Sequence, residues 1–172
     1  GTQNTAVGSL ALDANTTASY NTAIGYNSLT ANTTGANNTA VGRESLYGNT
    51  TASNNTAVGY NAMNVNTTGA DNTAVGTNAL DANTTGSYNA AFGKHALTAS
   101  TTADYNSAFG TTCLYSNTTG NYNTTVGADS LKNNTTASSN TACGYAALKE
   151  NTTGYQNVAV GQHALLSNTE GF

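Results

Sequence analysis

The residues of this chain that could carry chemistry are asparagines in the tripeptide Asn-Thr-Thr, which recurs at a fixed spacing. An asparagine two residues before a hydroxyl is the acceptor for N-linked glycosylation in secreted proteins. These candidate glycosylation sites are Asn15, Asn32, Asn49, Asn66, Asn83, Asn117, Asn134 and Asn151. The competing interpretation is structural, because sugars on every copy of so short a spacing would crowd one another.

The other reactive residue types do not combine into a catalytic or metal site. His95 and His163 stand four repeats apart, too far to share a metal ion. Cys113 and Cys143 occupy different places in the repeat and are too distant for a disulfide, so we interpret them as small apolar fillers. The eight acidic residues are scattered. We therefore expect no enzymatic activity, no cofactor and no bound metal.

A strict 17-residue repeat positions all of these residues. Each copy is close to Asn-Thr-Ala-Val-Gly-x-x-Ala-Leu-x-x-Asn-Thr-Thr-Gly-x-x, and its residues are called positions 1 to 17 below. A period without insertions indicates a single repeat array over residues 1–172 in which each unit stacks only on its neighbours. Because the chain starts and stops inside a unit, we expect it to be a piece of a longer tract. The units begin at Asn4, Asn21, Asn38, Asn55, Asn72, Asn89, Asn106, Asn123, Asn140 and Asn157.

The residue types predict strands rather than helices. Asn, Thr and Gly are weak helix formers, whereas Thr and Val suit strands and Asn and Gly suit tight corners. We predict one strand at positions 2 to 4, a corner at the glycine of position 5, a second strand at positions 7 to 10 and a turn at positions 12 to 15. The predicted fold is an all-β parallel β-solenoid of ten 17-residue coils, ~4.8 Å apart and ~48 Å long.

Stacking of identical coils places the asparagines of positions 1 and 12 in columns. Each side-chain amide is expected to donate to the next coil and to accept from the previous one, as in cross-β stacks. Buried or corner amides need hydrogen-bond partners, so this structural role is the interpretation we favour for the ten position 1 asparagines. The same role competes with glycosylation at position 12.

Neighbouring residues on a strand face opposite sides, which leaves two alternatives for the core. Either Val of position 4 and Leu of position 9 fill the coil and columns of small residues face outward, or the small residues fill a thin coil and Val and Leu form an exposed apolar stripe. Both alternatives indicate a second chain packed alongside. Because one Val and one Leu per coil form a thin core, we expect a homo-oligomer, with a trimer favoured, or a head-to-tail fibre.

The run Asn-Thr-Ala-Val-Gly-x-x-Ala-Leu resembles the head repeat of trimeric autotransporter adhesins. It also resembles Asn-Thr-Ala-Val-Gly-rich repeats of phage tail-fibre and bacterial surface proteins. The first resemblance implies a left-handed parallel β-roll and trimerisation, although the adhesin repeat is shorter than 17 residues and lacks the Asn-Thr-Thr-Gly corner. Both resemblances imply an extracellular location, on a cell surface, on a virion or in a secreted filament.

Composition excludes several kinds of partner. The net charge of −4 gives no electrostatic basis for binding nucleic acid or an anionic membrane, and no apolar run is long enough to insert into a bilayer. The outward positions 6, 7, 10, 11, 16 and 17 vary in type, which favours a structural fibre or shaft segment over a binder. The alternative is a repetitive surface that binds carbohydrate or a host receptor, or, less favoured because the two threonines of positions 13 and 14 are adjacent, ice.

Overall fold

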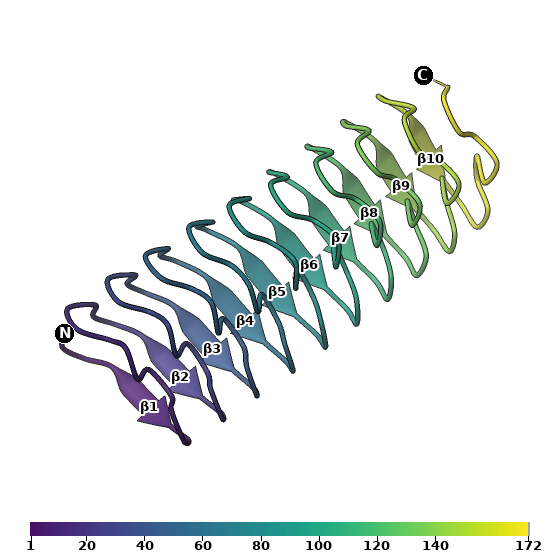
Figure 1. Ribbon diagram of the computed structural model, residues 1–172. Helices are drawn as coiled ribbons and strands as arrows, with labels where there is room; N and C mark the ends of the chain where they lie inside the picture. The colour runs from purple at the N-terminus through teal and green to yellow at the C-terminus, as the bar shows by residue number, and fades with distance from the viewer. Residues whose placement is uncertain (172) are drawn as a thin grey trace.

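The computed structural model describes residues 1–171 and forms a straight rod, a parallel β-solenoid with one short strand in each coil (Figure 1). Each strand pairs with the next in the chain, in parallel and with identical repeat positions opposite each other, as in Thr56↔Thr73 and Val58↔Val75. The predicted fold class is thus confirmed; Phe172, at the end of the predicted array, lies outside the described residues. The strands are β1 (Thr5–Val7), β2 (Thr22–Ile24), β3 (Thr39–Val41), β4 (Thr56–Val58), β5 (Thr73–Val75), β6 (Ala90–Phe92), β7 (Ser107–Phe109), β8 (Thr124–Val126), β9 (Thr141–Cys143) and β10 (Val158–Val160).

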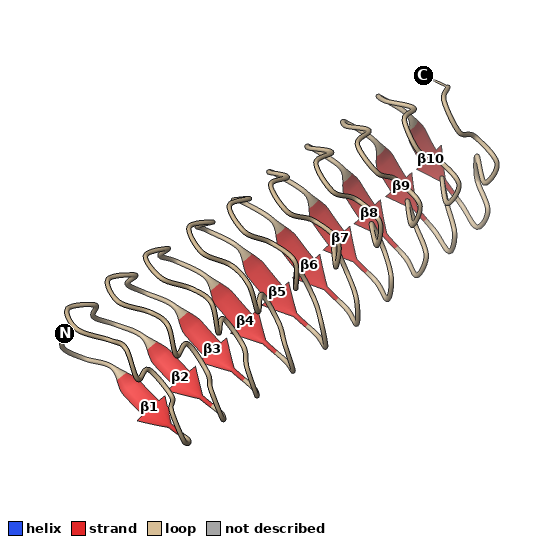
Figure 2. Cartoon of the chain, viewed as in Figure 1, coloured by secondary structure: helices blue, strands red, loops and turns tan. Residues whose placement is uncertain are grey.

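The predicted second strand at positions 7 to 10 is wrong, because two tight turns occupy this part of the coil. In the fifth coil the Ala79 N–H donates to the Gly76 carbonyl at 3.3 Å, and the Asn83 N–H donates to the Leu80 carbonyl at 3.3 Å. Positions 7 and 9 have left-handed backbone, with φ of 54° at Asn78 and 52° at Leu80. This geometry breaks the pleat of a strand and turns the chain back within a few residues, so that strands lie on only one side of the rod (Figure 2).

The core matches neither of the two sequence alternatives. On the strand, Ala of position 3 points inward and is fully buried, as at Ala74, while the side chain of position 4 points outward, as at Ile24 with 39% exposure. At positions 8 and 9 the small residue and the leucine are both buried, as at Ala79 and Leu80. Strand alternation does not apply there because these residues lie in turns. The core therefore combines two small residues and one leucine per coil.

The leucine of position 9 adopts a strained backbone in order to fill this core. The nine leucines and Met63 that occupy the position have φ between 47° and 57°. Left-handed backbone costs a residue with a Cβ about 1–2 kcal/mol, whereas burying a leucine side chain contributes about 1.5–3 kcal/mol. The burial offsets the strain, which explains why no unit places a glycine at this position.

The glycine of position 5 is required for a different reason, since both its backbone and its surroundings exclude a side chain. Its φ lies between 124° and 150° in the ten coils, a region that only glycine adopts readily. A Cβ on Gly144 would come within 2.5 Å of the Gly161 carbonyl oxygen in the next coil. Successive corners are thus in backbone contact, and this contact sets how closely the coils stack.

We predict that Gly144→Ala lowers the free energy of unfolding by about 3 kcal/mol or more, because it combines backbone strain with an intercoil clash. Gly161→Ala is the matched control: its φ is 124°, but a Cβ there meets only the Ala164 Cβ at 4.0 Å. Its cost should be the strain alone, about 1–2 kcal/mol. Denaturant unfolding compares the two variants, and equal losses would contradict the intercoil contact.

Candidate functional site

The asparagine of position 1 closes every coil and joins it to the next. The Asn72 Nδ2 donates to the carbonyl of Gly86, at position 15 of the same coil, at 2.8 Å, and its Oδ1 accepts the backbone N–H of Asn89 at 2.9 Å. The first bond recurs in all ten coils and the second at all nine coil interfaces. One side chain therefore supplies both the closure of a coil and its link to the next coil.

The asparagine of position 12 bonds to the same carbonyl from the other side. In the fourth coil the Gly69 carbonyl accepts the Nδ2 of both Asn55 and Asn66, each at 2.9 Å. The Asn66 Nδ2 also donates to the Asn49 Oδ1 in the previous coil at 2.9 Å, and its Oδ1 accepts from Asn83 at 2.8 Å. This direction is opposite to the predicted one, since each amide donates to the previous coil and accepts from the next.

The folded coil completely buries seven of the eight predicted acceptors of position 12. Both N–H groups of an amide such as Asn66 are used in the ladder, and an attached sugar would replace one of them. Asn15, in the first coil, is partly buried. The buried corner therefore explains why Asn-Thr-Thr recurs at position 12. Exposed asparagines that also stand two residues before a threonine are Asn37 and Asn54 of position 17. The fully buried candidates are Asn32, Asn49, Asn66, Asn83, Asn117, Asn134 and Asn151.

One coil interrupts the ladder of position 12. Ser100 stands where the other units have asparagine, and its hydroxyl is too short to reach either neighbour. The Ser100 Oγ and the Asn83 Oδ1 are both buried without a hydrogen-bond partner. Asn117, on the other side of the gap, donates only to the Gly120 carbonyl. The sixth coil is therefore a weak point between two ladder segments, one from Asn32 to Asn83 and one from Asn117 to Asn168.

Two outward columns of the rod are chemically uniform. Threonine occupies position 14 in nine of the ten units and is exposed in each. Its neighbour at position 13 is partly buried in most coils and donates its hydroxyl to the next coil, as from Thr67 to the Thr84 carbonyl at 2.9 Å. The second uniform column is the apolar position 4. Its side chains are partly exposed at Val41, Val58 and Val75, and more exposed at Ile24 (39%), Phe109 (41%) and Val126 (46%).

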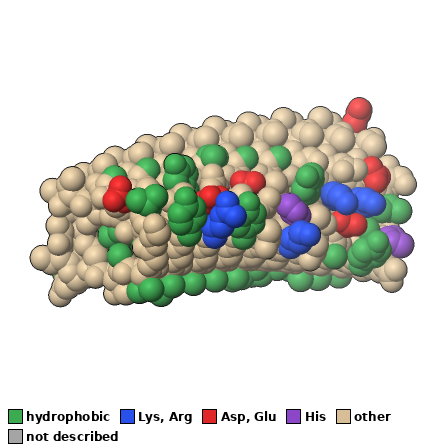
Figure 3. Space-filling model, turned by 60° about the horizontal axis from the view of Figure 1, so that its bottom comes forward, with side chains coloured by type: hydrophobic (Ala, Val, Ile, Leu, Met, Phe, Trp, Pro, Cys, Tyr) green, Lys and Arg blue, Asp and Glu red, His purple; other side chains and the backbone are tan. Residues whose placement is uncertain are grey.

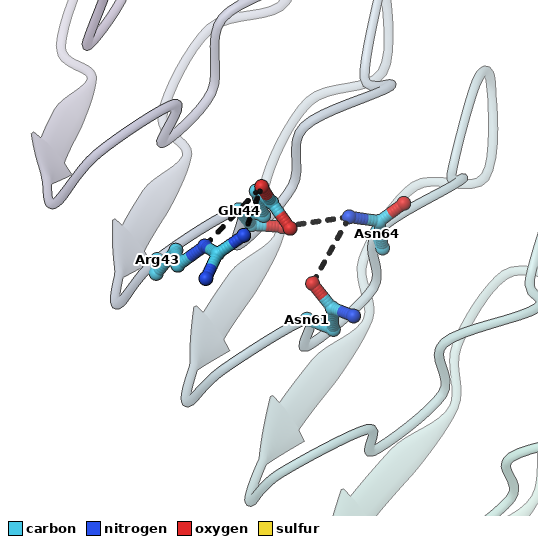
Figure 4. A network of polar contacts seen from close by, with 4 residues as sticks. All are labelled: Arg43, Glu44, Asn61 and Asn64. Atoms are coloured by element: carbon cyan, nitrogen blue, oxygen red, sulfur yellow. Dashed lines mark hydrogen bonds and ion pairs between the residues drawn. The ribbon is translucent and has the colours of Figure 1, made fainter. Parts of the chain in front are cut away.

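The basic side chains and the histidines gather on a different side of the rod (Figure 3). All four Lys and Arg residues and both histidines occupy positions 6, 7 and 10 of the repeat. In the third coil the Arg43 guanidinium lies 5.5 Å from the centre of the Tyr60 ring and 3.2 Å from the Glu44 carboxylate. The Asn64 Nδ2 donates to the Glu44 carbonyl at 3.1 Å and to the Asn61 Oδ1 at 3.4 Å (Figure 4). We call positions 6, 7 and 10 the decorated face.

A second ion pair on the decorated face has a clear electrostatic effect. A hydrogen bond from the Thr112 hydroxyl and the nearby ammonium of Lys132, 3.0 Å from the carboxylate, lower the pKa of Asp129. Burial raises the pKa of Asp81, which lies at position 10 of the fifth coil. These carboxylates are too far apart along the rod to act as an acid–base pair.

Exposed aromatic rings stack at the spacing of the coils. Tyr88, Tyr105 and Tyr122 of position 17 form a parallel stack with ring centroids 4.8 and 5.1 Å apart. Phe92 and Phe109 of position 4 stack at 4.9 Å. The outer side chains therefore repeat the register of the backbone, so a surface feature continues from coil to coil wherever the residue type does.

The cysteines and histidines lie apart, as their spacing predicts. Both cysteines are free; Cys113 is buried, and burial raises the pKa of its thiol to about 11. Cys143 is exposed at position 4 of the outer face, so the interpretation of it as a filler is wrong. His95 meets Tyr115 with ring centroids 6.0 Å apart, and His163 meets Tyr145 at 5.4 Å. Residues 1–171 contain no group of three potential metal ligands.

No protein-family model, no curated protein and no solved structure matches the chain. The described part of the rod has no detectable pocket. It also has no helix that is long and apolar enough to cross a membrane. The function must therefore be argued from the ladders and from the outer columns themselves.

We predict that Ser100→Asn raises the free energy of unfolding by about 1–3 kcal/mol, because it gives a partner to a buried unpaired oxygen. The new amide would donate to the Asn83 Oδ1 and the Ala103 carbonyl and accept from Asn117. Ser116→Asn, in the next coil at position 11, where the following unit already has Asn133, is the matched control. Denaturant unfolding should show stabilisation by the first change only; no gain would contradict the proposed defect.

Proposed function

We propose that the chain is a shaft segment of an extracellular fibre, of the kind found in adhesins or tail fibres, and that its role is mechanical. The observation that carries the proposal is the coil-closing bond of the position 1 asparagine, which is present in all ten coils. A chain that repeats one closure without variation maintains the same cross-section along its whole length.

The contacts explain why such a rod resists bending and opening. Each coil interface combines parallel strand pairing, the position 1 link and, at most interfaces, the position 12 amide ladder. These bonds lie inside the coil, where the amides are shielded from water, and hydrogen bonds in a buried setting are costly to break. Contacts are confined to neighbouring coils, so length is gained simply by adding units.

The proposal also covers the partners and the location of the chain. We propose a homo-oligomer, because an apolar column remains exposed along the side of the rod. We propose no nucleic-acid partner, no membrane insertion and no enzymatic role. A location on a cell surface, on a virion or in a secreted filament is proposed from the resemblance of the repeat to adhesin and tail-fibre sequences.

Small-angle X-ray scattering tests the shaft. The chain should behave as a rod about 48 Å long, and a variant with five inserted copies of residues 72–88 should be about 24 Å longer at the same cross-section. Asn72→Ala combined with Asn89→Ala removes two adjacent closures and should bend or break the rod. Asn37→Ala with Asn54→Ala, at exposed positions, is the matched control; a compact particle or no change in length with added units would contradict the shaft.

A binding surface is the second candidate, and the decorated face favours it. Tyr26 and Tyr60 of position 6 are 49% and 43% exposed, and Arg43 of the same column lies between them. Exposed rings beside a guanidinium and carboxamides are suited to stacking on sugar rings and to hydrogen bonding with their hydroxyl groups. This is the carbohydrate or receptor-binding role that the sequence leaves as an alternative.

A panel of neutral and acidic oligosaccharides tests this second candidate with the folded chain. If the decorated face binds sugar, Tyr60→Ala should weaken binding about tenfold, because a ring that stacks on the ligand and positions Arg43 is lost. Tyr122→Ala, which removes an exposed ring from a different column, should leave binding unchanged. Equal losses in both variants, or no binding by the wild-type chain, would count against this role.

A further inference from the structure

We propose that the outer face of the ten-stranded sheet is the surface on which a second copy of this chain packs. The face consists of the outward side chains at positions 2 and 4 of every coil, and we call it the Thr–Val face. The inference rests on the proposed shaft and deepens it, because it names the partner and the surface by which copies of the shaft associate.

The composition of the Thr–Val face is more restricted than the coil requires. Position 4 holds Val, Ile, Phe or Cys, so its outward space accepts side chains of very different size. Because the side chains of position 4 face solvent, polar residues would be tolerated there as well, as they are at positions 6, 7 and 10. Yet no polar or charged residue occurs at position 4, and no charged residue occurs at position 2, in any of the ten units. The position 4 residues are Val7, Ile24, Val41, Val58, Val75, Phe92, Phe109, Val126, Cys143 and Val160.

The position of the charges supports the same surface. Every basic side chain lies on the decorated face, and the acidic residues occupy positions 7, 10, 11, 14, 16 and 17. Two copies with the chain's net charge of −4 can therefore approach through their Thr–Val faces without burying a charged group. Within residues 1–171, no other long side of the rod combines this neutrality with an exposed apolar column.

The partner on the Thr–Val face is a copy of this chain, because only a partner with the same rise per coil stays in register along the rod. The strands repeat every ~4.8 Å, and facing sheets interdigitate their side chains when their repeats agree. A face ~48 Å long and ~10 Å wide on each chain gives a total interface of about 1,000 Å². That area is about the smallest at which specific protein interfaces are stable, so the whole length of the face must be used.

Cys143 provides a reporter for this interface in the unmodified chain. It stands in the position 4 column, exposed and free, whereas Cys113 is buried in the core. If copies pack through the Thr–Val face, alkylation of Cys143 should slow at least tenfold as the protein concentration is raised across the association range. Cys113 should remain unreactive throughout near pH 8, because burial and a pKa of about 11 keep its thiol protonated.

A pair of double variants completes the test. Val58→Lys with Val75→Lys adds two charges to the Thr–Val face and should raise the dissociation constant by more than about 100-fold. Thr68→Lys with Thr85→Lys adds the same charges to position 14 of the same two coils and should leave association unchanged. Light scattering measures association as multiples of the 17.3 kDa chain mass, and circular dichroism checks that each variant is folded.

The outcomes separate this inference from the shaft itself. Concentration-dependent association that only the Val58/Val75 variant abolishes, with Cys143 protected, would support the interface. A chain that stays monomeric at every concentration, or that associates while Cys143 remains fully reactive, would overturn the Thr–Val face even if scattering still showed a rigid rod. Loss of the rod shape in the wild-type chain would instead overturn the shaft.

Discussion

The structure depends on one acceptor in each coil, the carbonyl of position 15, which receives the asparagine amide of position 1 and, in most coils, that of position 12 as well. In the fourth coil these are Asn55 and Asn66, from the start of the coil and from its last corner. Because both side chains occupy the interior, one side of the coil is filled by polar groups, and in the fourth coil all of them are paired. The apolar side has space only for an alanine, a second small residue and one leucine. This narrow space accounts for the residue types at positions 3, 8 and 9 of the repeat.

The backbone strain of the coil follows from the same constraint. A coil of 17 residues with so narrow an interior must reverse direction sharply, and it does so at positions 5, 7, 9 and 17, all with positive φ. Glycine is required at position 5, where the next corner would touch a Cβ. At position 9 the strain is tolerated because the leucine side chain is needed in the core. Strain is therefore distributed along every coil and offset locally by burial and by hydrogen bonds.

Much of this architecture could be predicted from the period, and the errors have identifiable causes. The invariant Asn and Gly and the Thr-Ala-Val run correctly predict a stacked parallel solenoid with a strand at positions 2 to 4. The second strand was expected because Leu80 and its equivalents look like strand residues, yet their left-handed φ depends on the closure of the coil and leaves no trace in residue type. For the same reason the rule of alternating faces failed at Ala79 and Leu80, which are both buried. The Asn-Thr-Thr acceptors illustrate a related difficulty, since a local motif cannot show that the amide of Asn66 already has two partners.

A comparison within the chain distinguishes residues that the coil requires from residues that it merely permits. Asn72 and Gly76 have equivalents in every unit because each has an intercoil bond or contact that no other residue type could replace. Ser100 shows that a single missing rung is tolerated, which is expected when each interface contributes separately to stability. Position 4 differs from both cases, since the coil accommodates Val75, Phe92 and Cys143 equally there, and yet every unit keeps it apolar. The side chains of position 4 therefore vary in size but not in polarity, and the coil itself does not require this. On a neutral, flat sheet face, contact with another apolar surface accounts for it.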